Sequence, residues 1–190
     1  MDARSRRSLE RLSAAVLTLA ADAAVQSLSV TEIARAAGVH RSTFYEHSDS
    51  PAHLLRTTLL AELDETRGRH LAGEEPRDWG AAVRTTTLDV LDHLERHQAV
   101  YLRSLADPAD GTLSALLSEH FCASVVLLLD RGIADSPVTD HHVAARFIAD
   151  GVVGAVTVWL SGTPLRDRND FLEDLGRLVP PWWPLSPDWH

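Results

Sequence analysis

Residues 29–55 read SVTEIARAAGVHRSTFYEHSDSPAHLL, and this stretch decides the fold that we predict. Its first part predicts a helix over residues 30–37, because apolar side chains recur there at the spacing of one helical face. Those side chains are Val30, Ile33, Ala34 and Ala37. Ser29 with Glu32 fits a capping box at the start of this helix. Gly38 fits the position after its end, where the backbone takes a positive φ.

A second short helix is predicted over residues 40–47, with Phe44 on its buried side. Ala34 is small enough to let the two helices approach, and Val39 would turn inward beside Phe44. This is the geometry of a helix-turn-helix, which presents polar side chains of its second helix to base edges and phosphates. The alternative is that two helices joined at Gly38 only pack together.

The predicted DNA-contacting side chains lie on or near the outer face of this corner. Arg41 is the best candidate for a bidentate contact with guanine, because its planar fork matches O6 and N7. Thr31 would contact a phosphate from the first of the two helices. The complete set of candidates is Thr31, His40, Arg41, Ser42, Thr43, Tyr45 and His47.

The run GVHRSTFYEHSDSPAHLL resembles the corner and recognition helix of TetR-type bacterial transcription regulators. The matching positions are Gly38, Val39, Thr43, Phe44, Tyr45, His47, Leu54 and Leu55. The resemblance is specific over about the first 57 residues, and beyond them it rests on length and helical layout. The chain departs from the family pattern at Ser48, where an aromatic residue is frequent, and at Pro51, where a lysine often meets a phosphate.

The resemblance implies an all-α protein of about nine helices, with a three-helix head and a helical bundle. We expect a helix-turn-helix DNA-binding domain at residues 1–57 and a ligand-binding and dimerisation domain at residues 58–190. The resemblance also implies a homodimeric transcription regulator, a repressor that a small-molecule inducer releases from double-stranded operator DNA. Dimerisation would use the last two long helices.

Apolar periodicity and turn residues predict the remaining helices. Their expected ranges are 8–24, 51–71, 76–97, 97–106, 112–131, 138–160 and 167–179, with breaks at 73–76 and 107–111. Ser50 would cap the helix that begins at Pro51. Residues 1–7 fit either a disordered arm that reaches the DNA backbone or a frayed terminus. Gly151 and Gly154 allow close helix approach, either within the chain or against a partner subunit.

The net charge of −9 is unevenly distributed along the chain. Residues 1–56 carry seven arginines against six acidic residues, whereas residues 57–190 carry eleven arginines against twenty-one acidic residues. A near-neutral head on an acidic body fits a protein whose DNA contacts need only local positive charge. Cys122 is the single cysteine, which suits a reducing cytosol. We expect a cytoplasmic protein with no signal peptide and no membrane span.

The large aromatic residues beyond the head are candidates for lining an inducer cavity. They are Trp79, Tyr101, Phe121, Phe147 and Trp159. Each could instead be an ordinary core residue. An apolar or aromatic small molecule is the ligand that such a lining favours.

No catalytic set, phosphate-binding glycine loop or cofactor motif is evident, so we expect neither an enzyme nor a bound cofactor. His93 and His97 stand at i, i+4 on one helix face, a spacing that could hold a metal, but no third ligand is evident nearby. Ordinary surface or pocket histidines are the interpretation that the sequence favours, so we name no metal site, and whether these two bind a metal stays open. Two other classes stay open: a helical small-molecule carrier or enzyme that retains an unused head, and an interaction protein whose acidic body binds another protein.

Overall fold

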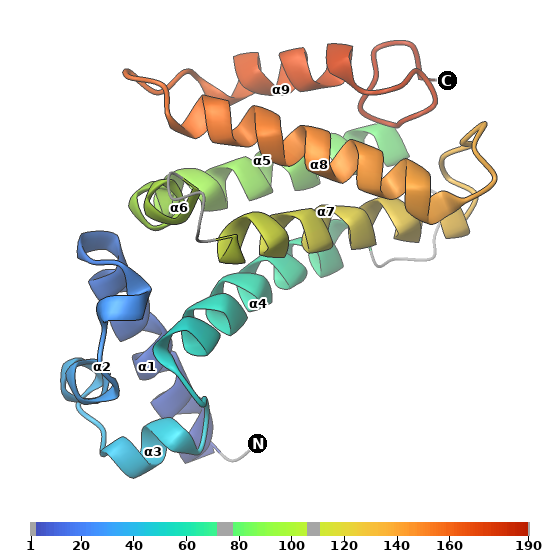
Figure 1. Cartoon of the computed structure of the whole chain (residues 1–190). Coiled ribbons are helices and arrows are strands. Elements are labelled where there is room, and N and C mark those ends of the chain that lie inside the picture. Colours follow the sequence, from blue (N-terminus) through green and yellow to red (C-terminus); the bar gives the residue numbers. More distant parts are fainter. Residues whose placement is uncertain (1–2, 72–77, 106–110, 190) are drawn as a thin grey trace. The chain divides into compact units, whose positions relative to one another are not determined.

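The computed structural model describes residues 3–71, 78–105 and 111–189, and within them the backbone forms nine α-helices, one 3₁₀ turn and no strand. The elements are α1 (Ala3–Asp22), η1 (Val25–Ser27), α2 (Val30–Ala37), α3 (Arg41–Tyr45), α4 (Pro51–Leu71), α5 (Trp79–Arg96), α6 (Gln98–Leu105), α7 (Thr112–Asp130), α8 (His141–Leu160) and α9 (Arg168–Leu178), all drawn in Figure 1. This confirms the all-α prediction.

The residues group into two compact units. The first unit comprises Met1–Ala61 and His97–Leu113, and the second comprises Glu62–Arg96 and Ser114–His190. The sequence predicts a DNA-binding domain at residues 1–57 and a ligand-binding and dimerisation domain at residues 58–190. That assignment of roles stays a prediction.

In the first unit, α1 packs against α2 and α6. Side chains at helical spacing form its core: Leu12, Ala15, Val16 and Ala20 of α1, Ile33, Ala34 and Ala37 of α2, and Phe44 of α3. Two polar contacts join segments that are distant in the sequence. Thr58 Oγ1 donates to Ser13 Oγ over 2.9 Å, and Arg103 Nη2 donates to the Ala21 carbonyl over 3.0 Å. The apolar stripe of α1 is therefore its buried face.

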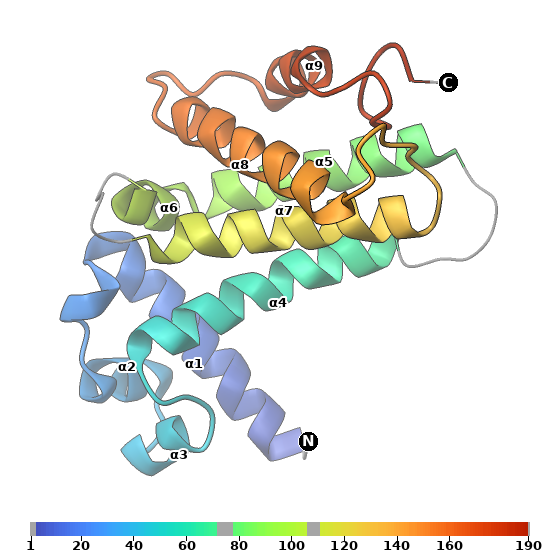
Figure 2. The same cartoon turned by 45° about the vertical axis from the view of Figure 1, so that its right-hand side comes forward.

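In the second unit, α9 packs against α5 and α8 (Figure 2). Its core cluster includes Leu71, Val83, Val125, Leu128, Ala145, Ile148 and Trp183. Trp159 of α8 stacks on Phe171 of α9 with ring centroids 5.0 Å apart. Asp92 of α5 accepts a hydrogen bond from the Arg168 guanidinium of α9, and this bond holds the pKa of Asp92 below its ordinary value. Aromatic packing and an ion pair thus both hold α9 in place.

The first helix begins at Ala3, five residues before the expected start at residue 8. Residues 3–7 are therefore helical, and neither a disordered arm nor a frayed end describes them. Ser8 Oγ donates to the Arg4 carbonyl over 3.1 Å, and Arg6 lies 3.7 Å from Glu10 in an i, i+4 pair that favours helix. The prediction for residues 1–2 lies outside the described residues.

The starts of α8 and α4 are fixed by side chains that cap the first turn of each helix. Helix α8 begins at His141 instead of residue 138, because the Asp140 carboxylate accepts from the backbone N–H of His142 and Val143 and so fixes the start. Ser50 Oγ accepts from the His53 N–H at the start of α4, as predicted. Of the predicted breaks, residues 73–76 and 107–110 lie outside the described residues.

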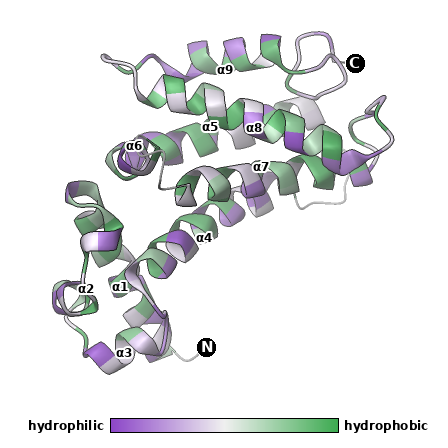
Figure 3. Cartoon of the chain, viewed as in Figure 1, coloured by the Kyte–Doolittle hydropathy of each residue, from purple (hydrophilic) through white to green (hydrophobic). Residues whose placement is uncertain are grey.

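Helices α7 and α8 are each long and apolar enough to cross a membrane by length and composition alone, although polar residues interrupt both of them (Figure 3). In each helix 44% of the apolar window is buried within the protein. The core helices of soluble proteins pass the same test, because they also need a continuous apolar surface.

Candidate nucleic-acid interface and ligand cavity

The corner between α2 and α3 is fixed by its backbone. Gly38 has φ +61°, and its N–H donates to the carbonyls of Ala34 and Arg35, which closes α2. The Val39 N–H also donates to the Ala34 carbonyl, over 2.9 Å. From α1, Arg11 Nη2 donates to the Gly38 carbonyl over 3.2 Å. The predicted glycine turn is confirmed, and the arginine that holds it from outside was not foreseen.

The start of α2 carries the predicted capping box. Ser29 Oγ accepts from the Glu32 N–H over 3.2 Å, and the Glu32 carboxylate accepts from the Ser29 N–H over 2.8 Å. The Ser29 hydroxyl also donates to this carboxylate, and that bond is the largest cause of a lowered pKa of Glu32. Both ends of α2 are therefore fixed by local hydrogen bonds.

The predicted DNA contacts occupy different environments around α3. Thr31, His40, Arg41 and Ser42 are exposed, Thr43 is half-buried, and Tyr45 is 54% exposed. Phe44 is fully buried and meets the ring of Tyr45 edge to face, with centroids 5.7 Å apart. One side of the Tyr45 ring therefore packs on the buried Phe44, while its outer side is exposed.

His47 differs from the other candidates. It follows Phe44 by three residues, so it turns towards the buried side of the short helix. Its side chain is half-buried, and its Nε2 atom is enclosed with no hydrogen-bond partner among the described residues. Of the seven predicted contacts, His47 is thus the least open to a ligand.

A shallow groove runs beside α3, between the first turns of α1 and the corner. Its lining comprises Arg4, Ser5, Arg7, Ser8, Arg11, Gly38, Val39, His40, Thr43 and Glu46. Three arginines face one carboxylate there, on a chain that is acidic overall. This set was not predicted, because the first helix was expected to begin at residue 8. The signal was present, since Arg4, Arg7 and Arg11 recur at helical spacing.

The second unit contains a cavity of about 80 Å³ with a mainly apolar wall. It is lined by Leu71, Val83, Thr86, Thr87, Val90, Leu91, His120, Phe121, Ser124, Val125, Leu128, Ile148, Val152, Val156, Leu175, Val179, Trp183 and Leu185. The hydroxyls of Thr86, Thr87 and Ser124 each donate to the carbonyl four residues earlier, over 2.8–3.0 Å. The wall therefore offers few unmet hydrogen bonds, which suits an apolar ligand.

His120 is the one ionisable residue among those that line this cavity, and it is 2% exposed. Its Nδ1 atom lies 3.2 Å from Asp64 Oδ1, and the Arg67 guanidinium lies 2.7 Å from the same oxygen. Burial, followed by the positive charge of Arg67, lowers the pKa of His120 to about 4. The imidazole is therefore neutral near pH 7, and the cavity stays uncharged.

Only one of the five aromatic residues predicted to contact a ligand lines the cavity, and that residue is Phe121. Trp79 packs half-buried beside the core cluster, and Tyr101 is fully buried in the first unit. Trp159 stacks on Phe171, and its Nε1 donates to the Arg166 carbonyl. Phe147 is 76% exposed. Sequence spacing alone does not distinguish the faces of an apolar helix, so the five aromatic residues lie in different environments, and their contact with a ligand stays a prediction.

The exposed face of α8 carries an apolar stripe formed by Val143, Phe147, Gly151, Gly154 and Val158. Phe147 and Val158 are each 76% exposed, and on α9 Leu178 is 75% exposed. A Cβ atom built on Gly151 or Gly154 would meet nothing within 4 Å. Within the described part of the chain the two glycines therefore do not serve packing, and their side of α8 is open to close approach.

Neither a protein-family model nor a curated protein matches this sequence significantly. Solved structures match its fold. A TetR-family regulator from Streptomyces coelicolor is 22% identical with a TM-score of 0.63, and the match covers 94% of this chain and 82% of that one. The TetR-family repressor FadR of Thermus thermophilus, solved with lauroyl-CoA, is 25% identical with a TM-score of 0.59, over 90% and 92% of the two chains.

NalD of Pseudomonas aeruginosa, the secondary repressor of the MexAB-OprM multidrug efflux pump, is 21% identical with a TM-score of 0.63. That match covers 98% of this chain and all of NalD. The chain therefore has the fold of the TetR-type transcription regulators, as its corner sequence predicts.

Proposed function

We propose that this chain, which has the TetR-type fold, is a cytoplasmic, non-enzymatic transcription regulator that binds operator DNA as a homodimer and is released by a small apolar ligand. The proposal rests on the side chains that are exposed at the corner between α2 and α3. Arg41, Ser42 and Tyr45 are exposed there beside the groove that holds three arginines.

Reading of DNA follows from the chemistry of the corner. Exposed polar side chains on a short, rigidly held helix suit contacts with base edges in a major groove. The arginines of the groove suit the phosphates that flank such a contact, because phosphate contacts position the protein while base contacts specify the sequence. Arg41 is the proposed base reader, and Thr31 with Arg7 would meet phosphates. His47, which is partly enclosed, would contribute least.

The α8 stripe supports the homodimer. Exposed apolar side chains flank two glycines there over about four turns of helix, so a second copy of the same face could approach closely. A two-fold axis brings the same patch of both subunits together, and an apolar stripe is complementary to itself. The dimer would place two recognition helices at half-sites about 34–36 Å apart on DNA.

The apolar cavity supports release by a ligand. Its wall includes Leu71 at the end of α4, and α4 runs without a break from Pro51 beside the corner. A ligand that displaced Leu71 would move the helix that follows the recognition segment. It would change DNA affinity only if it bound the two states unequally. The complex of Thermus FadR with lauroyl-CoA, in a protein of the same fold, favours a ligand with a long apolar part.

The test is selection of DNA from a random duplex pool, followed by gel shifts over a range of salt concentrations. The parent protein should enrich a pseudo-palindromic sequence and bind it more tightly as salt falls. Arg41→Ala should weaken binding by about 1–3 kcal/mol, roughly 5- to 150-fold, and relax the preference at one base pair.

Arg84→Ala is the matched control, because Arg84 is an exposed arginine on α5 in the second unit. It should bind the selected sequence like the parent. The proposal fails if the parent enriches no sequence, or if Arg41→Ala keeps both affinity and preference. Ligand binding without any DNA binding would instead favour a carrier with an unused head.

A further inference from the structure

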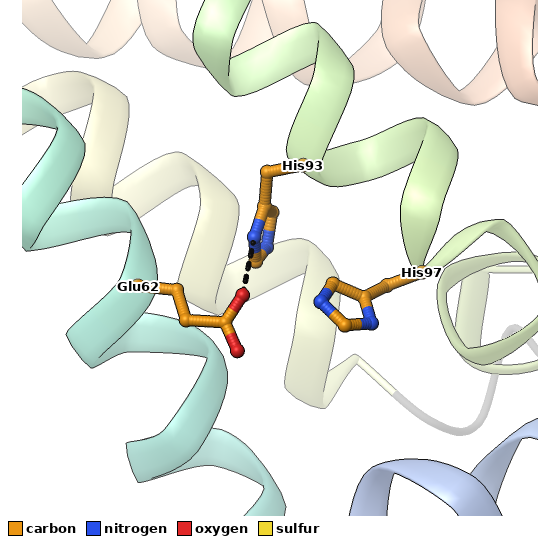
Figure 4. A group of neighbouring side chains, drawn as sticks. All are labelled: Glu62, His93 and His97. Carbon is orange, nitrogen blue, oxygen red and sulfur yellow. Dashed lines mark hydrogen bonds and ion pairs between the residues drawn. The ribbon is translucent and has the colours of Figure 1, made fainter. Parts of the chain in front are cut away.

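Three possible metal ligands lie together, one in the middle of α4 and two at the C-terminal end of α5 (Figure 4). Glu62 lies on α4, His93 lies on α5, and His97 is the first residue after α5. His93 Nδ1 lies 3.1 Å from Glu62 Oε2, and one ligand atom from each of the three residues lies within 4.8 Å of the others. The i, i+4 spacing of the histidines was visible in the sequence, and the fold adds the carboxylate that was missing.

Two imidazoles and one carboxylate form a donor set that suits Zn²⁺ and similar divalent transition metals. With metal–ligand bonds of about 2.0–2.2 Å, tetrahedral ligands lie about 3.3–3.5 Å apart. The pair of Glu62 and His93 is already that close. Because Glu62 is about one-third exposed and His97 is half-buried, modest side-chain rotation can bring the third donor in. A fourth position would be left for water or a ligand.

A simpler interpretation is a buried histidine satisfied by one carboxylate. His93 is 1% exposed and needs a partner for its ring nitrogen, which Glu62 provides. Arg96 also lies 3.7 Å from the same Glu62 oxygen, although its side chain is 55% exposed and can turn outwards. That interpretation does not require a second imidazole at coordinating distance, whereas a metal site does.

We propose that Glu62, His93 and His97 bind one divalent transition-metal ion per chain, with Zn²⁺ as the best match to the donors. This goes beyond the proposed function and does not depend on it, because the site can bind metal whether or not the chain binds DNA. The ion would tie α4 to the end of α5 and so stabilise the folded chain by linkage.

The experiment uses the untagged, full-length protein after removal of metal with a chelator. Co²⁺ is titrated in as a spectroscopic substitute for Zn²⁺, and equilibrium dialysis with Zn²⁺ gives the stoichiometry. The parent should bind one ion per chain, develop ligand-field absorption with Co²⁺, and unfold at a higher temperature with Zn²⁺ present.

Two single-site variants test the ligands, His97→Ala and Glu62→Gln. Each should weaken metal binding at least tenfold while keeping the helical circular dichroism of the parent, since neither side chain is fully buried. His141→Ala is the matched control, because His141 Nδ1 also lies beside a carboxylate, 2.9 Å from Asp130, but outside the cluster. It should bind metal like the parent. The proposal is overturned if the parent binds no Co²⁺ or Zn²⁺, or if both ligand variants bind as tightly as the parent.

Discussion

The corner of the first unit and the cavity of the second are built from interactions of different range. At the corner, Ser29 with Glu32 and Gly38 with Ala34 form hydrogen bonds between residues three or four apart. The cavity wall draws on residues from Leu71 to Leu185, carried by five helices and the C-terminal segment. Local signals therefore specify the first region, and only packing specifies the second. The comparison can be tested by changing matched residues in the two regions.

The largest expected difference concerns two phenylalanines. Phe44 is fully buried at the corner, whereas Phe121 is half-buried and borders the cavity. Phe44→Ala should lower the free energy of unfolding of the first unit by about 3–5 kcal/mol, because the tight packing leaves a new void. Phe121→Ala should lower the free energy of unfolding of the second unit by less, since the cavity already adjoins that ring.

The measurement is denaturant unfolding followed by two probes. All five tryptophans, at 79, 159, 182, 183 and 189, belong to the second unit, so their fluorescence reports on that unit while circular dichroism reports on both. Equal losses for the two variants would contradict the contrast in packing.

The second prediction concerns pH and His120, which faces Arg67, Asp64 and, at longer range, His93. Its pKa is about 4 in the folded protein and about 6.5 when unfolded, so the unfolded chain takes up the proton first. The stability of the second unit should therefore fall as pH drops from about 6.5 towards about 4, by up to about 3 kcal/mol.

Tryptophan fluorescence during urea unfolding at several pH values measures this loss. His120→Gln is the control, because an amide can still hydrogen-bond to Asp64 but does not titrate. If the variant keeps the full pH dependence of the parent over this window, another group is responsible.

The third prediction concerns the exposed stripe of α8. Phe147→Glu should raise the dimer dissociation constant about 30-fold, corresponding to about 2 kcal/mol, because it places a charge at the centre of an apolar interface. Sedimentation over a range of protein concentrations measures the change. Val138→Glu is the control, since Val138 is also exposed but precedes the helix. A parent that stays monomeric at every concentration would rule out the proposed dimer.

The smallest expected effect compares two glycines with similar backbone. Gly38 has φ +61° and Gly132 has φ +66°, one in each unit. Alanine at either position should lower the free energy of unfolding by about 1–2 kcal/mol, because the left-handed conformation strains an L-residue.

Gly38→Ala should cost up to about 1 kcal/mol more. Its Cβ would lie 2.4 Å from Arg11 Nη2 and displace the hydrogen bond that holds the corner, whereas a Cβ at Gly132 meets nothing within 4 Å. Circular dichroism and fluorescence unfolding curves of the two variants measure the difference. Equal costs would show that Arg11 adds nothing to the turn.

The sequence predicted correctly those features that depend on residues only a few positions apart. The bounds of α2, its capping box and the turn at Gly38 were all predicted, because caps and positive φ leave a signature within a few residues. The start of α1 was missed, although Asp2, directly before Ala3, is a residue type that often precedes a helix. The basic groove was missed with it, because Arg4 and Arg7 join Arg11 only when the helix begins at Ala3.

The amino-acid sequence by itself determined that the chain is helical and where the corner lies, because helical period and end residues act over three or four positions. Only the tertiary structure decided that Phe147 faces outwards, that Phe121 lines a cavity, and that Glu62 joins His93 and His97. An apolar helix such as α8 satisfies the hydrophobic pattern on several faces at once. Which face is buried depends on its neighbours, and those are chosen by packing across the whole unit.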